Sequence, residues 1–136
     1  MVKGAYLAKE VVVTVVNEIG ILADVSKILT DHGLNIEAVS GYADKDNNAK
    51  VMIITDDNLR ASDALKKSGY KSLKENEVII LELENKPGAL RLVTKSLATE
   101  GIDIKQIYGT ACSANCPARI VVSTSDNQKA LVMFKK

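Results

Sequence analysis

Two six-residue stretches carry the side chains that are best suited to hold a small charged molecule. They are Asn17-Glu18-Ile19-Gly20-Ile21-Leu22 and Asn85-Lys86-Pro87-Gly88-Ala89-Leu90. Each begins with an asparagine, whose amide offers both a donor and an acceptor, and soon reaches a glycine. Glycine lets the backbone approach a ligand closely because it has no Cβ. The pattern therefore predicts a place where backbone and amide meet a ligand.

The helix that each stretch is expected to open is the second chemical feature. After Gly20, apolar residues fall at Leu22, Val25, Ile28 and Leu29, a three-and-four spacing that is typical of an amphipathic helix. The first N–H groups of a helix are unpaired and carry partial positive charge, so they favour a carboxylate. An asparagine beside such a helix start suits a zwitterion, which has both a carboxylate and an ammonium.

The same residues also have a purely structural interpretation. An asparagine before a turn can hydrogen-bond its own backbone, and Pro87 suits the first helical turn because its missing N–H is not needed there. Spacing alone leaves both interpretations open for Asn17 and for Asn85.

The two stretches belong to a repeat with a constant offset of 68 residues. The further pairs are Gly33 with Gly101, Asn35 with Asp103, Ile36 with Ile104, and Gly41 with Gly109. A fixed offset of this kind indicates an internal duplication. Asp103, when ionised, can only accept hydrogen bonds, so it favours an ammonium and repels a carboxylate. We therefore expect two unequal sites, with the fuller set formed by Asn17, Gly20 and Asn35.

The expected elements follow the order β-α-β-β-α-β in each half, which divides the chain into units 1–75 and 76–136. In the first half they are strand 11–16, helix 21–32, strands 36–43 and 50–55, a helix from 56–58 to Gly69, and a short strand 70–73. In the second they are strand 78–83, helix 90–99, strands 102–109 and 119–123 around a loop 110–118, and a helix from Ser125 or Asp126. This order predicts α+β, ferredoxin-like units whose antiparallel sheets carry both helices on one face.

The second unit reaches Lys136 without a last strand. An unpaired strand edge promotes aggregation, so something is expected to cover it. The candidates are the N-terminal arm, where Val2 to Leu7 form a short edge strand or a loose arm, the neighbouring unit, and a partner subunit.

Composition narrows the class of protein. A chain of 136 residues with 46% hydrophobic and 26% charged residues is typical of a soluble globular protein. The net charge of +1 with interspersed signs argues against nucleic acid, and no apolar run is long enough for a membrane span. Two cysteines without a signal-peptide core predict a reducing cytoplasm and no structural disulfide.

Other candidate residues predict little chemistry. Cys112 and Cys116 are too widely spaced for a usual metal knuckle, which leaves a loop with incidental or redox-responsive thiols and, as an alternative, a metal site. His32, the sole histidine, is expected at a helix C-terminus, where its charge suits the dipole. No nucleophile–base set can be assembled, so we expect no enzymatic activity, no cofactor and no metal.

The repeated pattern resembles ACT domains, the small-molecule-sensing modules attached to many amino-acid metabolic enzymes. The resemblance is carried by Val13 to Leu22 with Gly33-Leu34-Asn35-Ile36, and by Leu81 to Leu90 with Gly101-Ile102-Asp103-Ile104. A histidine sometimes found two residues before the first asparagine is replaced by Val15 and Leu83. The chain looks like the stand-alone proteins that have two ACT domains and no catalytic domain.

The resemblance implies an effector site between neighbouring ACT units, near the loop after the first strand and the start of the second strand. The residues carried over are Asn17 to Leu22, Asn35 and Ile36, and Asn85 to Leu90, Asp103 and Ile104. We expect a non-catalytic regulatory module that binds a small amino acid, forms a homodimer and acts on a metabolic enzyme. The alternatives are a ligand-free oligomerisation module, suggested by the missing last strand, and a redox or metal sensor at the cysteines.

Overall fold

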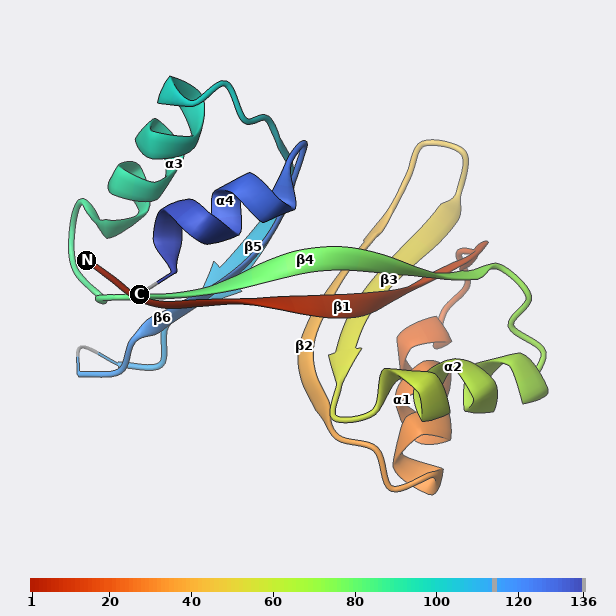
Figure 1. Ribbon diagram of the computed structural model, residues 1–136. Coiled ribbons are helices and arrows are strands. Elements are labelled where there is room, and N and C mark those ends of the chain that lie inside the picture. The colour runs from red at the N-terminus through yellow and green to blue at the C-terminus, as the bar shows by residue number, and fades with distance from the viewer. Residues whose placement is uncertain (114, 136) are drawn as a thin grey trace. The chain divides into compact units, whose positions relative to one another are not determined.

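The computed structural model describes residues 1–113 and 115–135 (Figure 1). Their helices and strands are β1 (Val2–Val16), α1 (Ile21–Asp31), β2 (Ile36–Ala43), β3 (Asn48–Thr55), α2 (Asn58–Lys67), β4 (Leu73–Leu83), α3 (Ala89–Thr99), β5 (Ile104–Thr110), β6 (Ala118–Thr124) and α4 (Asn127–Phe134). Two compact units result, Lys9–Asn76 and Met1–Ala8 with Glu77–Lys136, called here the first and the second unit. Ala114 of the expected loop 110–118 and the expected chain end at Lys136 lie outside the described residues.

The first unit has the strand order β2-β3-β1-β4. β1 pairs antiparallel with β3, from Val11 opposite Ile53 to Val16 opposite Asn48, and β2 pairs antiparallel with the other side of β3. Successive strand residues point to opposite faces, so alternate residues of β1 and β3 turn toward the helices. The core that joins them to both helices consists of Val11, Val13, Val25, Leu29, Leu34, Val51, Ile53, Ala61 and Leu65.

The second unit has the strand order β1-β4-β6-β5. β4 pairs antiparallel with β6 from Ile79 opposite Val122 to Leu83 opposite Ala118, and β5 pairs with β6. Both helices pack on its sheet through a core of Val2, Ile79, Leu81, Leu83, Ala89, Val93, Leu97, Ile102, Val122, Ala130 and Phe134. The α+β, ferredoxin-like fold class that the sequence predicts is confirmed.

The N-terminal residues of β1 take the place of the last strand that the second unit lacks. The N–H of Glu84 donates to the carbonyl of Met1 at 2.8 Å, and Val2 is buried in the core of this unit. The N-terminal arm is therefore the candidate that covers the edge of β4. This grouping differs from the expected division into 1–75 and 76–136, because residues 1–8 belong with 77–136.

β4 is one continuous strand from Leu73 to Leu83, whereas the sequence predicts two separate strands, 70–73 and 78–83. Lys74, Glu75 and Glu77 are exposed within it. Charged side chains can occupy the solvent side of a strand without interrupting its backbone ladder. Residues 74–77 therefore belong to the strand, and the predicted break between 70–73 and 78–83 is wrong.

The start of the second helix is built in the same way in both units. Asn58 accepts from the N–H and the hydroxyl of Thr55 at 3.0 and 2.9 Å, and Asn127 accepts from the same groups of Thr124 at 2.9 and 2.8 Å. Such side-chain bonds to the backbone fix where the helix begins. The correspondence between the units thus extends to individual hydrogen bonds.

Candidate functional site

The N-terminus of α1 is open to a ligand. Its N-cap, Gly20, has φ 92° and ψ 3°, and no side chain caps the helix. A Cβ placed on Gly20 would meet no atom within 4 Å, so the surrounding space is empty. This left-handed conformation is strained for other residues, which explains why a glycine stands there. The N–H of Ile21 donates to the carbonyl of Glu18 at 3.4 Å, and the next two N–H groups of the helix are available to an anion.

A cavity of about 450 Å³, called here the β2 cavity, lies beside this helix start. It is lined by Asn17, Glu18, Gly20, Ile21, Leu22, Val39, Ser40, Gly41, Tyr42, Ala43, Ala49, Lys50 and Val51. Its size is that of ordinary small-molecule sites. Lys50 is the cation of this lining, and together with the helix start it favours an anionic group. Leu22, Val39 and Tyr42 add exposed apolar surface.

A second cavity of about 420 Å³, called here the Tyr70 cavity, shares Glu18, Gly20 and Ile21 with the first. The hydroxyl of Tyr70 donates to Oδ2 of Asp24 at 2.5 Å. Burial, and then this hydrogen bond, raise the pKa of Tyr70 to about 12. Glu18 lines both cavities, but the carboxylate of Asp24 lines only this one and Lys50 only the other, so a ligand carboxylate is better placed in the β2 cavity.

Asn17, which lines the β2 cavity, is held by the turn between β2 and β3. Its N–H donates to the carbonyl of Asn47 at 2.8 Å, and its own carbonyl accepts from Nδ2 of Asn47 at 3.3 Å. Asn47 has φ 60°, a left-handed conformation that asparagine tolerates better than most residues. Both bonds use the main chain of Asn17, which leaves its side-chain amide for other partners.

Asn35 and Ile36 lie at the opposite end of α1. The N–H of Asn35 donates to Oδ1 of Asp56 at 3.0 Å, and its carbonyl accepts from the N–H of Asp56 at 3.3 Å. The 11 residues of α1 place the two ends roughly 16 Å apart. Within one unit, the structure therefore does not bring Asn35 together with Asn17.

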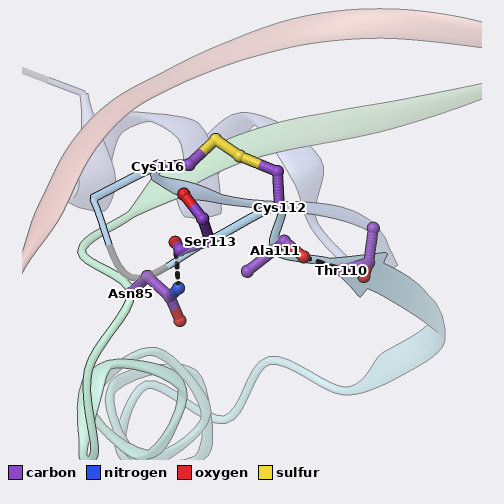
Figure 2. Close-up of a disulfide and its surroundings, with 6 residues drawn as sticks. All are labelled: Asn85, Thr110, Ala111, Cys112, Ser113 and Cys116. Atoms are coloured by element: carbon purple, nitrogen blue, oxygen red, sulfur yellow. Dashed lines mark hydrogen bonds between the residues drawn. A yellow bond between two sulfur atoms is a disulfide. The ribbon is translucent and has the colours of Figure 1, made fainter.

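The junction between β4 and α3 in the second unit corresponds to the start of α1. It is filled by residues of the chain itself. Gly88, the N-cap of α3, also has a left-handed φ of 89°, but the methyl of Met1 lies 3.7 Å from the position of a Cβ. Nζ of Lys86 lies 2.9 Å from Oε2 of Glu84, and this ion pair holds the pKa of Glu84 below its usual value. Nδ2 of Asn85 donates to the carbonyl of Ser113 at 2.6 Å (Figure 2).

Asp103 and Ile104 lie at the far end of α3, as Asn35 and Ile36 do in the first unit. The N–H of Asp103 donates to Oγ of Ser125 at 2.9 Å, and the carboxylate of Asp103 lies 3.0 Å from Nζ of Lys105. The acidic side chain thus already has a cationic partner. This pairing weakens the attraction for a ligand ammonium that the sequence suggests.

Cys112 and Cys116 form a disulfide, with their Cα atoms 5.8 Å apart (Figure 2). The expectation that the two cysteines form no structural disulfide is wrong at this point. The N–H of Cys116 donates to the carbonyl of Ser113 at 3.0 Å, and this turn brings the two cysteines within disulfide reach. Because both sulfur atoms are bonded to each other, neither is a thiolate ligand for a metal.

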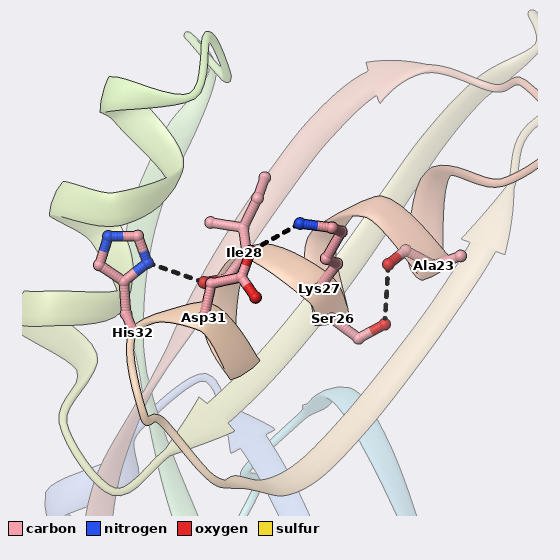
Figure 3. Close-up of polar contacts among 6 residues, drawn as sticks. All are labelled: Ala23, Ser26, Lys27, Ile28, Asp31 and His32. Atoms are coloured by element: carbon pink, nitrogen blue, oxygen red, sulfur yellow. Dashed lines mark hydrogen bonds and ion pairs between the residues drawn. The ribbon is translucent and has the colours of Figure 1, made fainter.

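Figure 3 shows polar contacts between neighbouring turns of α1 and at its C-terminal end. Nδ1 of His32 is 2.8 Å from the carbonyl of Ile28, and Nζ of Lys27 is 2.7 Å from Oδ2 of Asp31. The hydrogen bond and charge of Asp31 raise the pKa of Lys27. His32 ends the helix where the sequence places it, and it lines neither cavity.

A family model matches most of the first unit. Residues 9–67 match the model of the ACT domain. No curated protein matches the chain. The crystal structure of a Bacteroides thetaiotaomicron protein is similar at 27% identity, with a TM-score of 0.85 over 94% of this chain and 86% of that one.

Two further crystal structures share the fold at low identity. The ligand-free regulatory subunit of aspartate kinase from Thermus thermophilus is 14% identical, with a TM-score of 0.68 over 96% of this chain and 94% of that one. Aspartokinase alpha and beta subunits are also 14% identical, with a TM-score of 0.66 over 97% of this chain and 95% of the other. In the part of the chain that the structure describes, no helix is long and apolar enough to cross a membrane.

Sequence reasoning missed several residues that surround the open start of α1 in the first unit. Lys50 and Tyr42 come from strands β3 and β2, and Tyr70 follows α2, all far along the chain from Asn17. The polar turn 44–48 gave a signal for the hairpin, but nothing in it indicated that Asn47 would bind Asn17. Pairing of β1 with β3 supplies that contact.

Proposed function

We propose that this chain is a non-catalytic regulatory module that binds a small amino acid at the α1 N-terminus of its ACT domain. The observation that carries the proposal is the left-handed Gly20, which opens an uncapped helix start onto the β2 cavity. The ACT match over residues 9–67 supports it. The fold shared with a protein named as the regulatory subunit of an aspartate kinase supports the regulatory role.

The chemistry of the cavity accounts for each part of a zwitterion. The carboxylate lies against the first N–H groups of α1 and near Lys50, where helix dipole and side-chain charge act together. The ammonium lies toward the side-chain oxygen of Asn17 and the carboxylate of Glu18. The ligand side chain packs on Leu22 and Val39, both exposed apolar residues of the same lining.

The second unit is proposed to be another ACT domain with a lesser site. The hydrogen-bonded helix start at Thr124 and Asn127 repeats that of the first unit, and Gly88 repeats the left-handed N-cap of Gly20. Its asparagine, however, is bound to Ser113. We therefore place the principal amino-acid site in the first unit.

A homodimer is part of the same proposal. Asn17 and Asn35 lie at opposite ends of α1, so both can serve one ligand only if two copies of the chain contribute to the site. Such a site lies between ACT units, and its occupancy stabilises one association state or one contact with a metabolic enzyme in the cytoplasm. Binding then regulates by population shift rather than by catalysis.

Thermal-shift measurements against the proteinogenic amino acids test this function. An amino acid at about 100 times its Kd stabilises the folded state by about 2.7 kcal/mol, which raises the Tm by on the order of 5–15 °C for a chain of this size. Asn17→Ala is expected to reduce the shift, and Asn85→Ala serves as the matched control that keeps most of it. If no amino acid moves the transition at millimolar concentration, the proposal fails.

A ligand-free oligomerisation module is the second candidate function. The open strand edge that first suggested it is covered by residues 1–8, so its support now comes from β2. β2 ends the strand order, and it exposes Val39 by 47% and Tyr42 by 55%. This function predicts a dimer by light scattering that Tyr42→Lys disrupts and that no amino acid affects. A monomer in the same measurement would exclude it.

A further inference from the structure

The disulfide closes a small ring in the loop between β5 and β6. This ring contacts the junction between β4 and α3 in the second unit. The carbonyl of Ser113, inside the ring, accepts from the N–H of Cys116 at 3.0 Å and from Nδ2 of Asn85 at 2.6 Å (Figure 2). The turn that the disulfide closes is therefore the same turn that holds the asparagine side chain.

We propose that the Cys112–Cys116 disulfide is a redox latch on Asn85. In the oxidised protein the closed turn fixes the carbonyl of Ser113, which binds the Asn85 amide and keeps the α3 junction closed to ligand. Reduction opens the ring, frees the turn and releases Asn85. The ligand part of this inference rests on the proposed amino-acid function, whereas the latch itself does not.

The equivalent residue of the first unit shows what a released asparagine can do. Asn17 lines the β2 cavity, and within the described residues it bonds through its main chain. Asn85 occupies the corresponding place before a left-handed N-cap glycine, Gly88, yet its amide donates to the loop. The contact with Ser113 thus separates the two asparagines, in addition to the methyl of Met1 that lies near Gly88 but has no counterpart near Gly20.

The redox step is chemically complete with a dithiol as the reductant. A thiolate of the dithiol attacks one sulfur, the bond between Sγ of Cys112 and Sγ of Cys116 breaks, and the second thiol closes the reductant into its own disulfide. Two electrons and two protons leave the dithiol and appear as two cysteine thiols. Cys112 and Ser113 are exposed and Cys116 is half-buried, so a dithiol can reach the bond.

Thermodynamic linkage gives the latch a measurable signature that needs no amino acid. If the Asn85 bond is made only with the closed turn, it stabilises the oxidised form, and its loss makes reduction easier. A typical net hydrogen bond changes an equilibrium constant by about fivefold. Asn85→Ala should therefore shift the thiol–disulfide equilibrium toward the thiols by about that factor.

The experiment equilibrates the full chain in mixtures of reduced and oxidised dithiothreitol, alkylates the thiols and measures the reduced fraction by intact mass. Asn85 is exposed, so Asn85→Ala leaves the core untouched. Asn17→Ala removes the equivalent amide of the other unit and is the matched control, which should titrate like the wild type. An Asn85→Ala equilibrium equal to that of the wild type, or shifted toward the disulfide, would overturn the latch.

A calorimetric titration with each proteinogenic amino acid tests the gating. The oxidised chain is expected to bind at one site, and the chain in dithiothreitol at two, as is the Cys112→Ser/Cys116→Ser variant without reductant. Equal stoichiometry in both redox states would refute the gating while leaving the proposed function intact. Absence of binding in both states would refute the proposed function and the gating together, and the dithiothreitol equilibrium would still decide the latch.

Discussion

Gly20 offers the sharpest perturbation of the proposed site, because one methyl group changes only its conformational energy. At φ 92° an L-residue is strained, and no atom lies within 4 Å of the added Cβ. The left-handed conformation costs about 1–2 kcal/mol for a residue with a Cβ, so Gly20→Ala should lower the free energy of unfolding by about that amount. No steric contribution adds to it.

Two other glycines provide matched controls. Gly88 has φ 89°, and a Cβ added to it would meet only the methyl of Met1 at 3.7 Å, an ordinary contact. Gly88→Ala should therefore lower the free energy of unfolding by a similar amount. Gly4 has no positive φ and open space around it, so Gly4→Ala should not destabilise the fold. Urea unfolding measures all three, and an equal m-value shows that the change lies in stability.

Binding separates the two junctions. Gly20→Ala relaxes the backbone at the open helix start, so it should also weaken the binding of whichever amino acid stabilises the wild type, whereas Gly88→Ala should leave that binding in place. The reasoning is refuted if Gly20→Ala unfolds at the urea concentration of the wild type, or if both variants lose binding equally.

Three further predictions follow from individual contacts. Tyr70→Phe removes the hydroxyl bonded to Asp24 and should cost about 1 kcal/mol in urea unfolding. The pKa of Tyr70 in the folded state is raised to about 12, so its contribution to the free energy of unfolding is complete below pH about 10 and is lost as the pH rises toward 12. Alkaline unfolding curves of Tyr70→Phe should lack this loss of stability. Cys112→Ser/Cys116→Ser opens a ring of five residues and should cost about 2 kcal/mol by the loop-entropy relation, and thermal unfolding without reductant checks this value. Asp57→Ala removes the N-cap of α2 and should cost about 1 kcal/mol in urea unfolding, whereas Asp63→Ala, in the middle of the same helix, should not.

Local sequence patterns were sufficient for much of the fold. The β-branched run 11–16, the spacing of Val25 and Leu29 and the glycines after each first helix act over a few residues, so they predict strands, helices and boundaries directly. The place of residues 1–8 depends on partners more than 70 residues away, such as Glu84 for Met1. Nothing local distinguishes that arm from a loose one.

The same distinction applies to the site. Asn17 and Gly20 are adjacent along the chain, and their turn was predictable, whereas Lys50 reaches the cavity through the pairing of β1 with β3. Asn35 was grouped with Asn17 by motif, but the length of α1 separates them. The disulfide depends on a turn at Ser113 that a cysteine count cannot reveal.

Amide chemical-shift mapping tests the central claim most directly. A titration of ¹⁵N-labelled protein with the amino acid that most raises its Tm should perturb the backbone amides of Gly20, Ile21 and Leu22 first, together with that of Lys50 across the β2 cavity. Saturable shifts confined to these residues are the result that the account predicts. Shifts that bypass the α1 N-terminus, or no shifts with any amino acid, would contradict it.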